Sequence, residues 1–323
     1  MARESFPLGP VRVRPGAARD VELPITRLVT GAEVTLPVRV LHGRQDGPVV
    51  WLDAAIHGDE VVGVEIIRQV LATLSARTLR GTLIALPIVN VLGFHTQDRY
   101  LPDRRDLNRS FPGSARGSLA AQLAHLMMTE VVAKCEVGID LHTGSDGRSN
   151  LPQIRADLDD PRTRELSLAF GAPLMFHAKL RDGSLRWAGR EQGATVLVYE
   201  AGEPWRFDPW AIDAGVQGIL RVLGALDMTD PVPPAERPTR ESRSSAWIRA
   251  RRTGILRLEA ELGQEVAVGD RLGALYDSFG KTLRLVRAER PGVIIGKTEV
   301  PLVNSGDALV HVAQLEPACA GPW

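Results

Sequence analysis

Cysteine is scarce in this sequence, since only Cys135 and Cys319 occur among its 323 residues. Two cysteines are too few for the disulfide framework of a small secreted protein, and they exclude a cysteine-rich zinc site. Long hydrophobic runs are also missing, because none reaches the roughly 20 residues that a membrane-spanning helix requires. The N-terminal residues lack the apolar core of a signal peptide. We therefore expect a cytoplasmic protein without a membrane segment.

An excess of either charge is absent as well. Lys plus Arg and Asp plus Glu both number 39, so the formal net charge is +0. A general nucleic-acid binder needs a basic surplus to neutralise phosphates, and we therefore expect no nucleic-acid partner. Hydrophobic residues make up 44% and charged residues 24%, which is typical of a folded globular chain. A length of 323 residues predicts about two domains.

Apolar patterning in the long N-terminal part alternates between two periods. Short runs rich in β-forming residues are followed by longer segments with apolar residues at helical spacing. The expected strands are 48–56, 81–90, 137–144 and 194–202, and the expected helices are 60–74, 118–135, 161–171 and 211–227. This order predicts an α/β fold with a mixed, largely parallel sheet flanked by helices. Shorter alternating segments in residues 11–46 predict antiparallel strands at one edge.

A segment rich in Pro, Ser and Arg, residues 230–245, interrupts these patterns and is typical of an exposed linker. It divides the chain into residues 1–229 and residues 246–323. The second part has short apolar runs between Gly-containing turns, and the strings VAVGDRL and LVNSGDAL repeat a common pattern within it. We therefore predict a small all-β domain behind the linker, a barrel or sandwich made of two related hairpins.

Histidines lie at the ends of two expected strands. His57 and Glu60 follow one strand, and His142 ends another. Ligands of α/β sheets bind at the carboxyl ends of strands, and imidazole and carboxylate groups are normal zinc ligands. Asp140 faces the same way as His142 on an extended strand, where it could accept the free ring N–H of a metal-bound histidine. Taken singly, His57 and Glu60 also fit a surface or capping role, and His142 fits a purely structural one.

Two further places carry residues suited to catalysis or binding. Glu200 ends an expected strand, where a buried carboxylate is costly unless it works or is paired. We predict that Glu200 is a general base, with Glu203 as the rival and an ion pair with an arginine as the simpler interpretation. Asn108 and Arg109 adjoin in a loop, and an amide beside a guanidinium fork suits a substrate carboxylate. In the alternative interpretation, Asn108 caps a turn and Arg109 is a solvated charge.

Four motifs occur together in the order HGDE, DLNRSFPG, DLHTG and YEAG. In this combination they resemble the zinc carboxypeptidase clan and most closely the succinylglutamate desuccinylase/aspartoacylase family. The resemblance covers about residues 25–227. It implies a zinc-carboxypeptidase-like fold with one zinc ion per chain.

The same resemblance implies roles for individual residues. It assigns zinc binding to His57, Glu60 and His142, substrate-carboxylate binding to Asn108 and Arg109, and the general base to Glu200. An upstream arginine helps to polarise the scissile carbonyl in that family. Arg99 is the best match here, and Arg104 and Arg105 are the alternatives.

The C-terminal part resembles the β-barrel/sandwich hybrid of lipoyl- and biotin-carrying domains. Those carriers hold a modifiable lysine in a tight hairpin, often within the string EAMKM. The corresponding stretch here is YDSFGKT, in which Lys281 is nearby but the motif is absent. The resemblance therefore implies an unmodified structural module.

These features together predict a zinc-dependent amidohydrolase that removes an acyl group from a small N-acyl amino acid. Reactions of the aspartoacylase, desuccinylase and N-acetyl diamino acid deacetylase types all fit. One alternative keeps the metal but cleaves peptide C-termini, as a carboxypeptidase does. Another is a non-catalytic binding protein that uses the β module as its interaction surface. The expected partner is a small-molecule substrate, and the sequence allows a homo-oligomer without predicting one.

Overall fold

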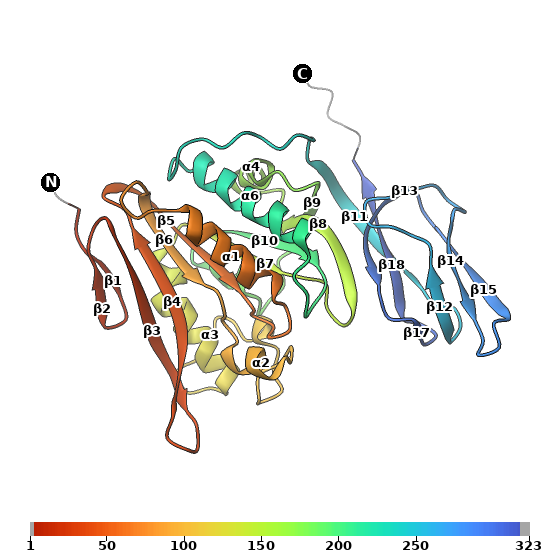
Figure 1. Cartoon of the computed structure of the whole chain (residues 1–323), viewed down its shortest axis with the longest axis horizontal. Helices are drawn as coiled ribbons and strands as arrows, with labels where there is room; N and C mark the ends of the chain where they lie inside the picture. The colour runs from red at the N-terminus through yellow and green to blue at the C-terminus, as the bar shows by residue number, and fades with distance from the viewer. Residues whose placement is uncertain (1–2, 317–323) are drawn as a thin grey trace.

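The computed structural model of the chain describes residues 3–316, so Cys319 lies outside the described part. One large sheet of twelve strands runs through the molecule, and a sheet of four strands lies at the C-terminal end (Figure 1). The two remaining strands, β1 (Phe6–Leu8) and β2 (Val11–Val13), pair as an antiparallel hairpin. Within residues 3–316, no helix has both the length and the apolar character needed to span a bilayer.

The large sheet is mixed. In spatial order its strands are β13 (Glu265–Val266), β16 (Gly292–Thr298), β18 (Ala308–Leu315), β11 (Arg240–Arg249), β9 (Leu174–His177), β8 (Arg148–Ala156), β10 (Thr195–Gly202), β7 (Val137–His142), β5 (Gln45–Ala54), β6 (Arg80–Leu86), β4 (Glu33–His42) and β3 (Ala17–Arg27). The centre, from β10 through β7 and β5 to β6, is parallel. Every residue of β7 is buried, as expected for a parallel strand covered on both faces.

Antiparallel pairs lie on both sides of this centre. β4 pairs with β6 and with β3, and β8 pairs with β10. The expectation of a largely parallel sheet therefore holds for the centre but not for the sheet as a whole. One reason is that only residues 143–147 separate β7 from β8. A loop that short cannot return the chain to the opposite edge, as a parallel strand would require.

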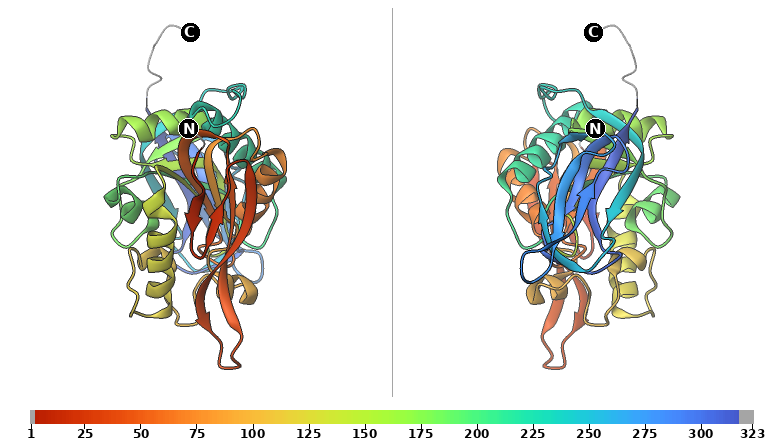
Figure 2. Two further views of the ribbon diagram at one scale, coloured as in Figure 1. Left: turned by 90° about the vertical axis from the view of Figure 1, so that its left-hand side faces the viewer. Right: turned by 90° about the vertical axis from the view of Figure 1, so that its right-hand side faces the viewer.

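Helices cover two faces of the sheet (Figure 2). The helices of one face are α1 (Val62–Thr73), α4 (Pro161–Phe170) and α6 (Pro209–Ala225), and those of the other are α3 (Leu119–Glu130) and α5 (Leu185–Glu191). The shorter helices are α2 (Val91–Thr96), η1 (Leu107–Arg109) and η2 (Val132–Lys134). In α1 the residues at helical spacing, Val62, Ile66 and Val70, are buried against the sheet. The helical periodicity in the sequence thus marks the core-facing stripe.

The C-terminal region has two layers. Its second sheet contains, in spatial order, β15 (Thr282–Arg287), β14 (Arg271–Tyr276), β12 (Gly254–Leu258) and β17 (Leu302–Val303). Apolar residues from this sheet and from β11, β16 and β18 form one buried cluster between the layers, which includes Leu272, Ile294 and Val310.

The two regions share one sheet, and the connection between α6 and β11 is residues 226–239. β11 begins at Arg240, so the last part of the predicted linker 230–245 is a strand that pairs in parallel with β9. β16 also pairs with β8, which closes a circuit of five strands through β8, β9, β11, β18 and β16. The start of β11 was not predicted because charged residues such as Glu241 have a low strand propensity, and here Glu241 is paired with Arg164. The closed circuit fixes the C-terminal region against the α/β region.

Candidate active site

A pocket of about 510 Å³ opens at the carboxyl ends of the central parallel strands. His57 and Glu60 lie in the loop between β5 and α1, and His142 is the last residue of β7. Glu200 lies near the end of β10, opposite His142 in the register. Because these strands end at the same edge of the sheet, side chains that are far apart in sequence meet in one cavity.

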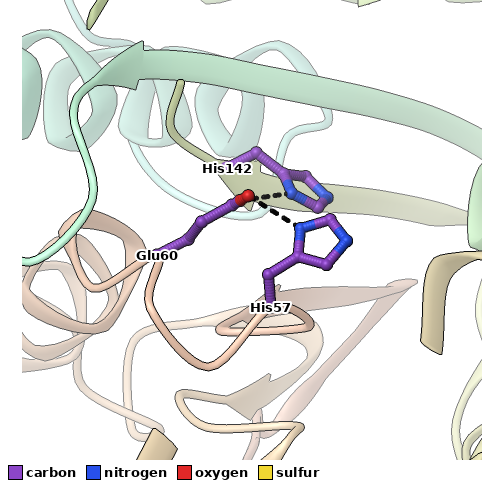
Figure 3. Close-up of side chains that lie close together, drawn as sticks. All are labelled: His57, Glu60 and His142. Atoms are coloured by element: carbon purple, nitrogen blue, oxygen red, sulfur yellow. Dashed lines mark hydrogen bonds and ion pairs between the residues drawn. The ribbon is translucent and has the colours of Figure 1, made fainter. Parts of the chain in front are cut away.

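His57, Glu60 and His142 form a compact buried cluster (Figure 3). His57 Nδ1 lies 2.7 Å from Glu60 Oε1, and His142 Nδ1 lies 2.7 Å from Glu60 Oε2. The ligand atoms of the three residues all lie within 4.8 Å of one another. Two imidazole nitrogens and a carboxylate are a common catalytic zinc set, which leaves a further coordination position open. The residues present therefore fit a catalytic zinc ion.

The outer nitrogen of each histidine lies beside a second carboxylate. His57 Nε2 is 3.2 Å from Asp106 Oδ1. His142 Nε2 is 2.8 Å from Asp140 Oδ1, an ion-pair distance, although the two groups are not aligned as a hydrogen bond. Carboxylates behind metal-binding imidazoles fix their tautomer and ring orientation. In this arrangement both Nδ1 atoms are directed at Glu60.

Glu60 and the two histidines shift one another's pKa values. Burial by itself would raise the pKa of Glu60, but the charges of His57 and His142 outweigh burial and hold this pKa below its ordinary value. Burial lowers the pKa of His142, whereas the charges of Asp140 and Glu60 raise it by more. Glu60 is therefore ionised at neutral pH, which is the form that binds a metal ion, whereas a metal ion would have to displace the proton of His142.

A buried carboxylate pair lies behind His142. Asp53 on β5 is the register partner of Asp140 on β7, and Trp51 Nε1 donates a hydrogen bond to Asp53 Oδ1 over 2.7 Å. Burial, followed by the charge of Asp140, raises the pKa of Asp53 well above its ordinary value. Two adjacent buried carboxylates cannot both ionise readily. We therefore expect Asp53 to hold a proton.

Arg99 is the candidate arginine that lines the pocket. Its Nη1 donates to Glu60 Oε1 over 3.1 Å, and its Nη2 donates to Asp106 Oδ2 over 3.2 Å. Arg104 and Arg105 are exposed, and neither lines the pocket. The geometry thus favours Arg99 as the guanidinium beside the residues His57, Glu60 and His142, which we call the metal cluster because they fit a metal ion. The action of Arg99 on a carbonyl stays a prediction.

Glu200 lines the pocket and is held by two side chains of β8. Arg155 Nη1 donates to Glu200 Oε1 over 2.8 Å, and Asn150 Nδ2 donates to Glu200 Oε2 over 2.7 Å. The predicted ion pair with an arginine is therefore present in the pocket itself. The rival Glu203 does not line the pocket and instead pairs with Arg206 over 2.5 Å.

Asn108 and Arg109 lie in η1 at another side of the same pocket. Asn108 Oδ1 accepts a hydrogen bond from the backbone N–H of Leu185 over 2.9 Å, which fixes the side-chain amide. The cap of η1 is Asp106, whose Oδ1 accepts from the backbone N–H of Asn108. Arg109 is exposed at the pocket edge, where its guanidinium donates to the backbone carbonyl of Asn108. Because Arg109 is exposed, loss of a bound carboxylate there costs less free energy than loss of one partner of a buried ion pair.

Several residues in and around the site were not found from the sequence. Asp106 heads the DLNRSFPG string, where a carboxylate could have been considered as a partner for a candidate metal-binding histidine. Asn150 and Arg155 were missed because β8 lacks the long apolar run of its neighbours. The C-terminal region also reaches the pocket through Trp247 and His311. No sequence motif marks them.

The pocket lining is strongly cationic. Lysine and arginine outnumber the carboxylates of Glu60, Asp140 and Glu200. The basic residues that line it are Arg99, Arg109, Arg148, Arg155, Lys179, Arg181, Arg186 and Arg249. Arg186 is buried. Burial, and after it the repulsion by Arg155, lowers the pKa of Arg186 to about 10. An anionic molecule would offset this charge.

Comparisons with known proteins show the family of this chain. The profile described as the succinylglutamate desuccinylase/aspartoacylase catalytic domain matches residues 46–226. N-alpha-acetyl-L-2,4-diaminobutyric acid deacetylase of Halomonas elongata is 28% identical over 296 residues, which cover 87% of this chain and 86% of that protein.

Solved structures agree over nearly the whole chain. A succinylglutamate desuccinylase/aspartoacylase from Rhodobacter sphaeroides is 28% identical with a TM-score of 0.83, covering 94% of this chain and 97% of that one. The product-bound ectoine utilization protein EutE (DoeB) from Ruegeria pomeroyi is 25% identical with a TM-score of 0.84, covering 97% and 98% respectively. The similarity therefore extends through the C-terminal β region.

Proposed function

Because this chain belongs to the succinylglutamate desuccinylase/aspartoacylase family, we propose that it is a zinc-dependent hydrolase. Its proposed reaction is cleavage of the amide bond of a small N-acyl amino acid. Water adds across that bond, so the carbon–nitrogen bond breaks, the hydroxyl group goes to the acyl carbon and a proton goes to the amine. The products are a carboxylate and a free amino acid.

The observation that carries this proposal is the orientation of the two histidines. His57 and His142 both direct Nδ1 at Glu60, while a carboxylate lies beside each Nε2. A histidine with a purely structural role needs no such pair of partners, whereas a metal-binding histidine commonly has one. A zinc ion held there would polarise the scissile carbonyl and lower the pKa of water towards about 7.

The surrounding side chains have separate roles in the proposed reaction. Glu200 accepts the proton of the attacking water and returns it to the leaving nitrogen. Its place opposite His142 on the neighbouring strand supports this role, since adjacent strands lie about 4.8 Å apart. Asn108 and Arg109 bind the carboxylate of the amino acid portion. Arg99 stabilises the negative charge that develops on the carbonyl oxygen.

The size and charge of the pocket support a small anionic substrate. A volume of about 510 Å³ suits a metabolite-sized ligand. The Halomonas elongata relative is named for an N-acetylated diamino acid, and the cationic lining of this pocket equally suits an N-acyl amino acid with an anionic group. We therefore propose the N-acyl amino acid class without choosing one member.

Metal analysis and a substrate panel test the proposal. We expect one zinc ion per purified chain and release of free amine from N-acyl amino acids. Faster release of C-terminal residues from peptides would favour the carboxypeptidase alternative. A metal-loaded chain that hydrolyses neither class would favour the non-catalytic binding protein.

Other features of the proposal rest on sequence alone. A cytoplasmic location and a structural, unmodified C-terminal module resembling lipoyl domains stay predictions. Lys281 follows an exposed turn between β14 and β15, where Asp277 accepts its backbone N–H. Mass spectrometry of the intact chain tests whether this lysine is modified.

A further inference from the structure

The end of the pocket nearest the C-terminal region carries a stacked aromatic pair. Trp247 on β11 and His311 on β18 are register partners. Their ring centroids lie 4.5 Å apart with an interplanar angle of 12°, and both residues line the same pocket as His57. The C-terminal region is thus part of the pocket wall.

Strand alternation explains why these two side chains face the pocket. Ile248 on β11 and Val310 and Val312 on β18 point into the apolar core of the C-terminal region. Successive side chains on a strand point to opposite faces, so Trp247 and His311 point away from that core. On that side the guanidinium of Arg148, from β8, lies 5.5 Å from the centroid of the Trp247 ring.

The histidine of this pair is neutral and oriented. Burial, followed by the charge of Arg155, lowers the pKa of His311 to about 3. Its Nε2 lies 2.8 Å from Ser245 Oγ, which fixes the ring. Within residues 3–316 no hydrogen bond occupies Nδ1. The pair therefore presents a flat, uncharged surface with one unused ring nitrogen in an otherwise cationic pocket.

The position of the pair relative to the metal cluster is fixed by strand pairing. β16 joins β18 to β8, and Gly296 on β16 pairs with both His311 and Asn150. Asn150 in turn donates its hydrogen bond to Glu200. Because these strands are paired in a closed circuit, the position of the stacked pair relative to Glu200 is fixed.

The order of strands indicates which part of a substrate meets the pair. β5 and β7, which end at the metal cluster, lie between β6 and the strands β10, β8 and β16. Asn108 is held by the backbone N–H of Leu185 at the start of α5, whereas Trp247 and His311 lie on β11 and β18, beyond β8. A substrate with its carboxylate at Asn108 and its scissile carbonyl at the metal cluster would extend its acyl group toward the stacked pair.

We propose that Trp247 and His311 form the wall that receives the acyl group, so that the C-terminal region helps to select the substrate. This inference rests on the proposed function and adds a specificity-determining surface to it. The indole limits the length of the acyl group, and the His311 ring packs against the indole and keeps it in place.

Two substrate series test this inference. One varies the acyl group from formyl through acetyl and propionyl to succinyl on a fixed amino acid, and the other varies the amino acid under a fixed acetyl group. Trp247→Ala should raise kcat/KM for the longer acyl groups relative to acetyl by about 10-fold, since one methylene group is worth that much in a fitted pocket. Trp247→Phe should shift the ratio in the same direction by less, and the amino acid series should keep its order.

Controls separate this surface from a structural role and from the proposed function. Phe279→Ala removes an aromatic side chain that is 96% exposed and outside the pocket, so it should leave both series unchanged. The zinc content of every variant should equal that of the wild type. Hydrolysis by the wild type reports on the proposed function, whereas the ratio between variants reports on the wall.

Two results would contradict the proposed acyl-group wall. An unchanged acyl series in both Trp247 variants, or a shift confined to the amino acid series, overturns the assignment. If the wild type hydrolyses no member, calorimetric binding of the same compounds replaces kcat/KM. The wall then stands only if Trp247→Ala changes the affinity order with acyl length, and an absence of wild-type binding refutes it together with the proposed function.

Discussion

The two ends of the pocket are built in different ways. At the metal end, His57, Glu60 and Asp106 lie in loops, and His142 is a strand terminus. At the far end, Trp247 and His311 are mid-strand residues, placed by antiparallel pairing between strands that are remote in sequence. Residues in loops after strands belong to short recognisable motifs, whereas mid-strand residues acquire a role only through the strands that pair with them.

Charge also differs between the ends. Carboxylates outnumber arginines around the metal cluster, where Glu60, Asp106 and Asp140 surround two histidines. At the far end Arg148 and Arg249 flank a neutral aromatic pair. We infer that the metal end serves the reaction and the far end serves selection. The following changes test that division, beginning with the largest expected effect.

Loss of a metal ligand should have the largest effect. His142→Ala removes one of three ligand groups and leaves Glu60 with a single histidine partner. We expect the variant to purify with much less zinc and to lose nearly all activity. Elemental analysis and turnover of an N-acyl amino acid check this outcome. His95→Ala, which alters an exposed histidine outside the pocket, is the control. Stoichiometric metal in His142→Ala would show the ligand assignment to be wrong.

Glu200→Gln should slow the reaction without loss of metal. A positioned acid/base group contributes about 10²–10⁴-fold, and the amide still offers an oxygen to Arg155. The measurements are kcat and zinc content, with Glu203→Gln as the matched control because Glu203 is outside the pocket. An inactive Glu203 variant beside an active Glu200 variant would reverse the two roles.

A small change in the C-terminal region should lower kcat. A Cβ atom added at Gly296 would lie 2.8 Å from Asn150 Oδ1, so Gly296→Ala must move the amide that donates to Glu200. A hydrogen bond to a charged group is worth about 1.5–3 kcal/mol, and we expect kcat to fall about 10-fold with little change in KM.

Gly224→Ala is the control for that substitution, because its added Cβ would meet nothing closer than 3.4 Å. Equal kcat values for Gly296→Ala and the wild type, in correctly folded proteins, would argue against coupling between the C-terminal region and Glu200.

Arg109 should contribute to carboxylate preference by a comparable or smaller factor. Because this side chain is exposed, we expect Arg109→Ala to lower kcat/KM for the free acid by about 5-fold at most, in line with the roughly 1 kcal/mol of an exposed ion pair. The corresponding carboxamide should be affected less. Arg109→Lys should restore part of the difference, since an ammonium group cannot form two parallel hydrogen bonds.

The exposed Arg105 offers a control for this change, since it lies outside the pocket. Equal wild-type rates for acid and carboxamide would remove the reason for placing a substrate carboxylate at Arg109.

The smallest expected effect is on stability. The pKa of His311 is about 3 in the folded chain, below its ordinary value of 6.5. The unfolded chain therefore binds a proton first as the pH falls, and stability is lost below about pH 6.5. Linkage gives a loss of about 1 kcal/mol between pH 6.5 and 5.5. His311→Asn should reduce this pH dependence in urea unfolding, and an unchanged slope would contradict the neutral state of His311.

Much of the α/β region could be predicted from the sequence. The helix predicted at 60–74 is α1 (Val62–Thr73), and the one predicted at 211–227 is α6 (Pro209–Ala225). Both carry a regular apolar stripe, which follows from local periodicity. β8 and β9 were missed because their burial depends on neighbours from the C-terminal region, such as Val293 and Ala313.

The sequence by itself determined which residues could bind a metal. His57, Glu60 and His142 can be identified from short strings because their chemistry is carried by residue type and by position at strand ends. The tertiary structure decided what surrounds them. Asp106 reaches His57, Arg155 and Asn150 reach Glu200, and the C-terminal strands close one end of the pocket. Such contacts depend on strand pairing over long distances in sequence, and local periodicity carries no information about them.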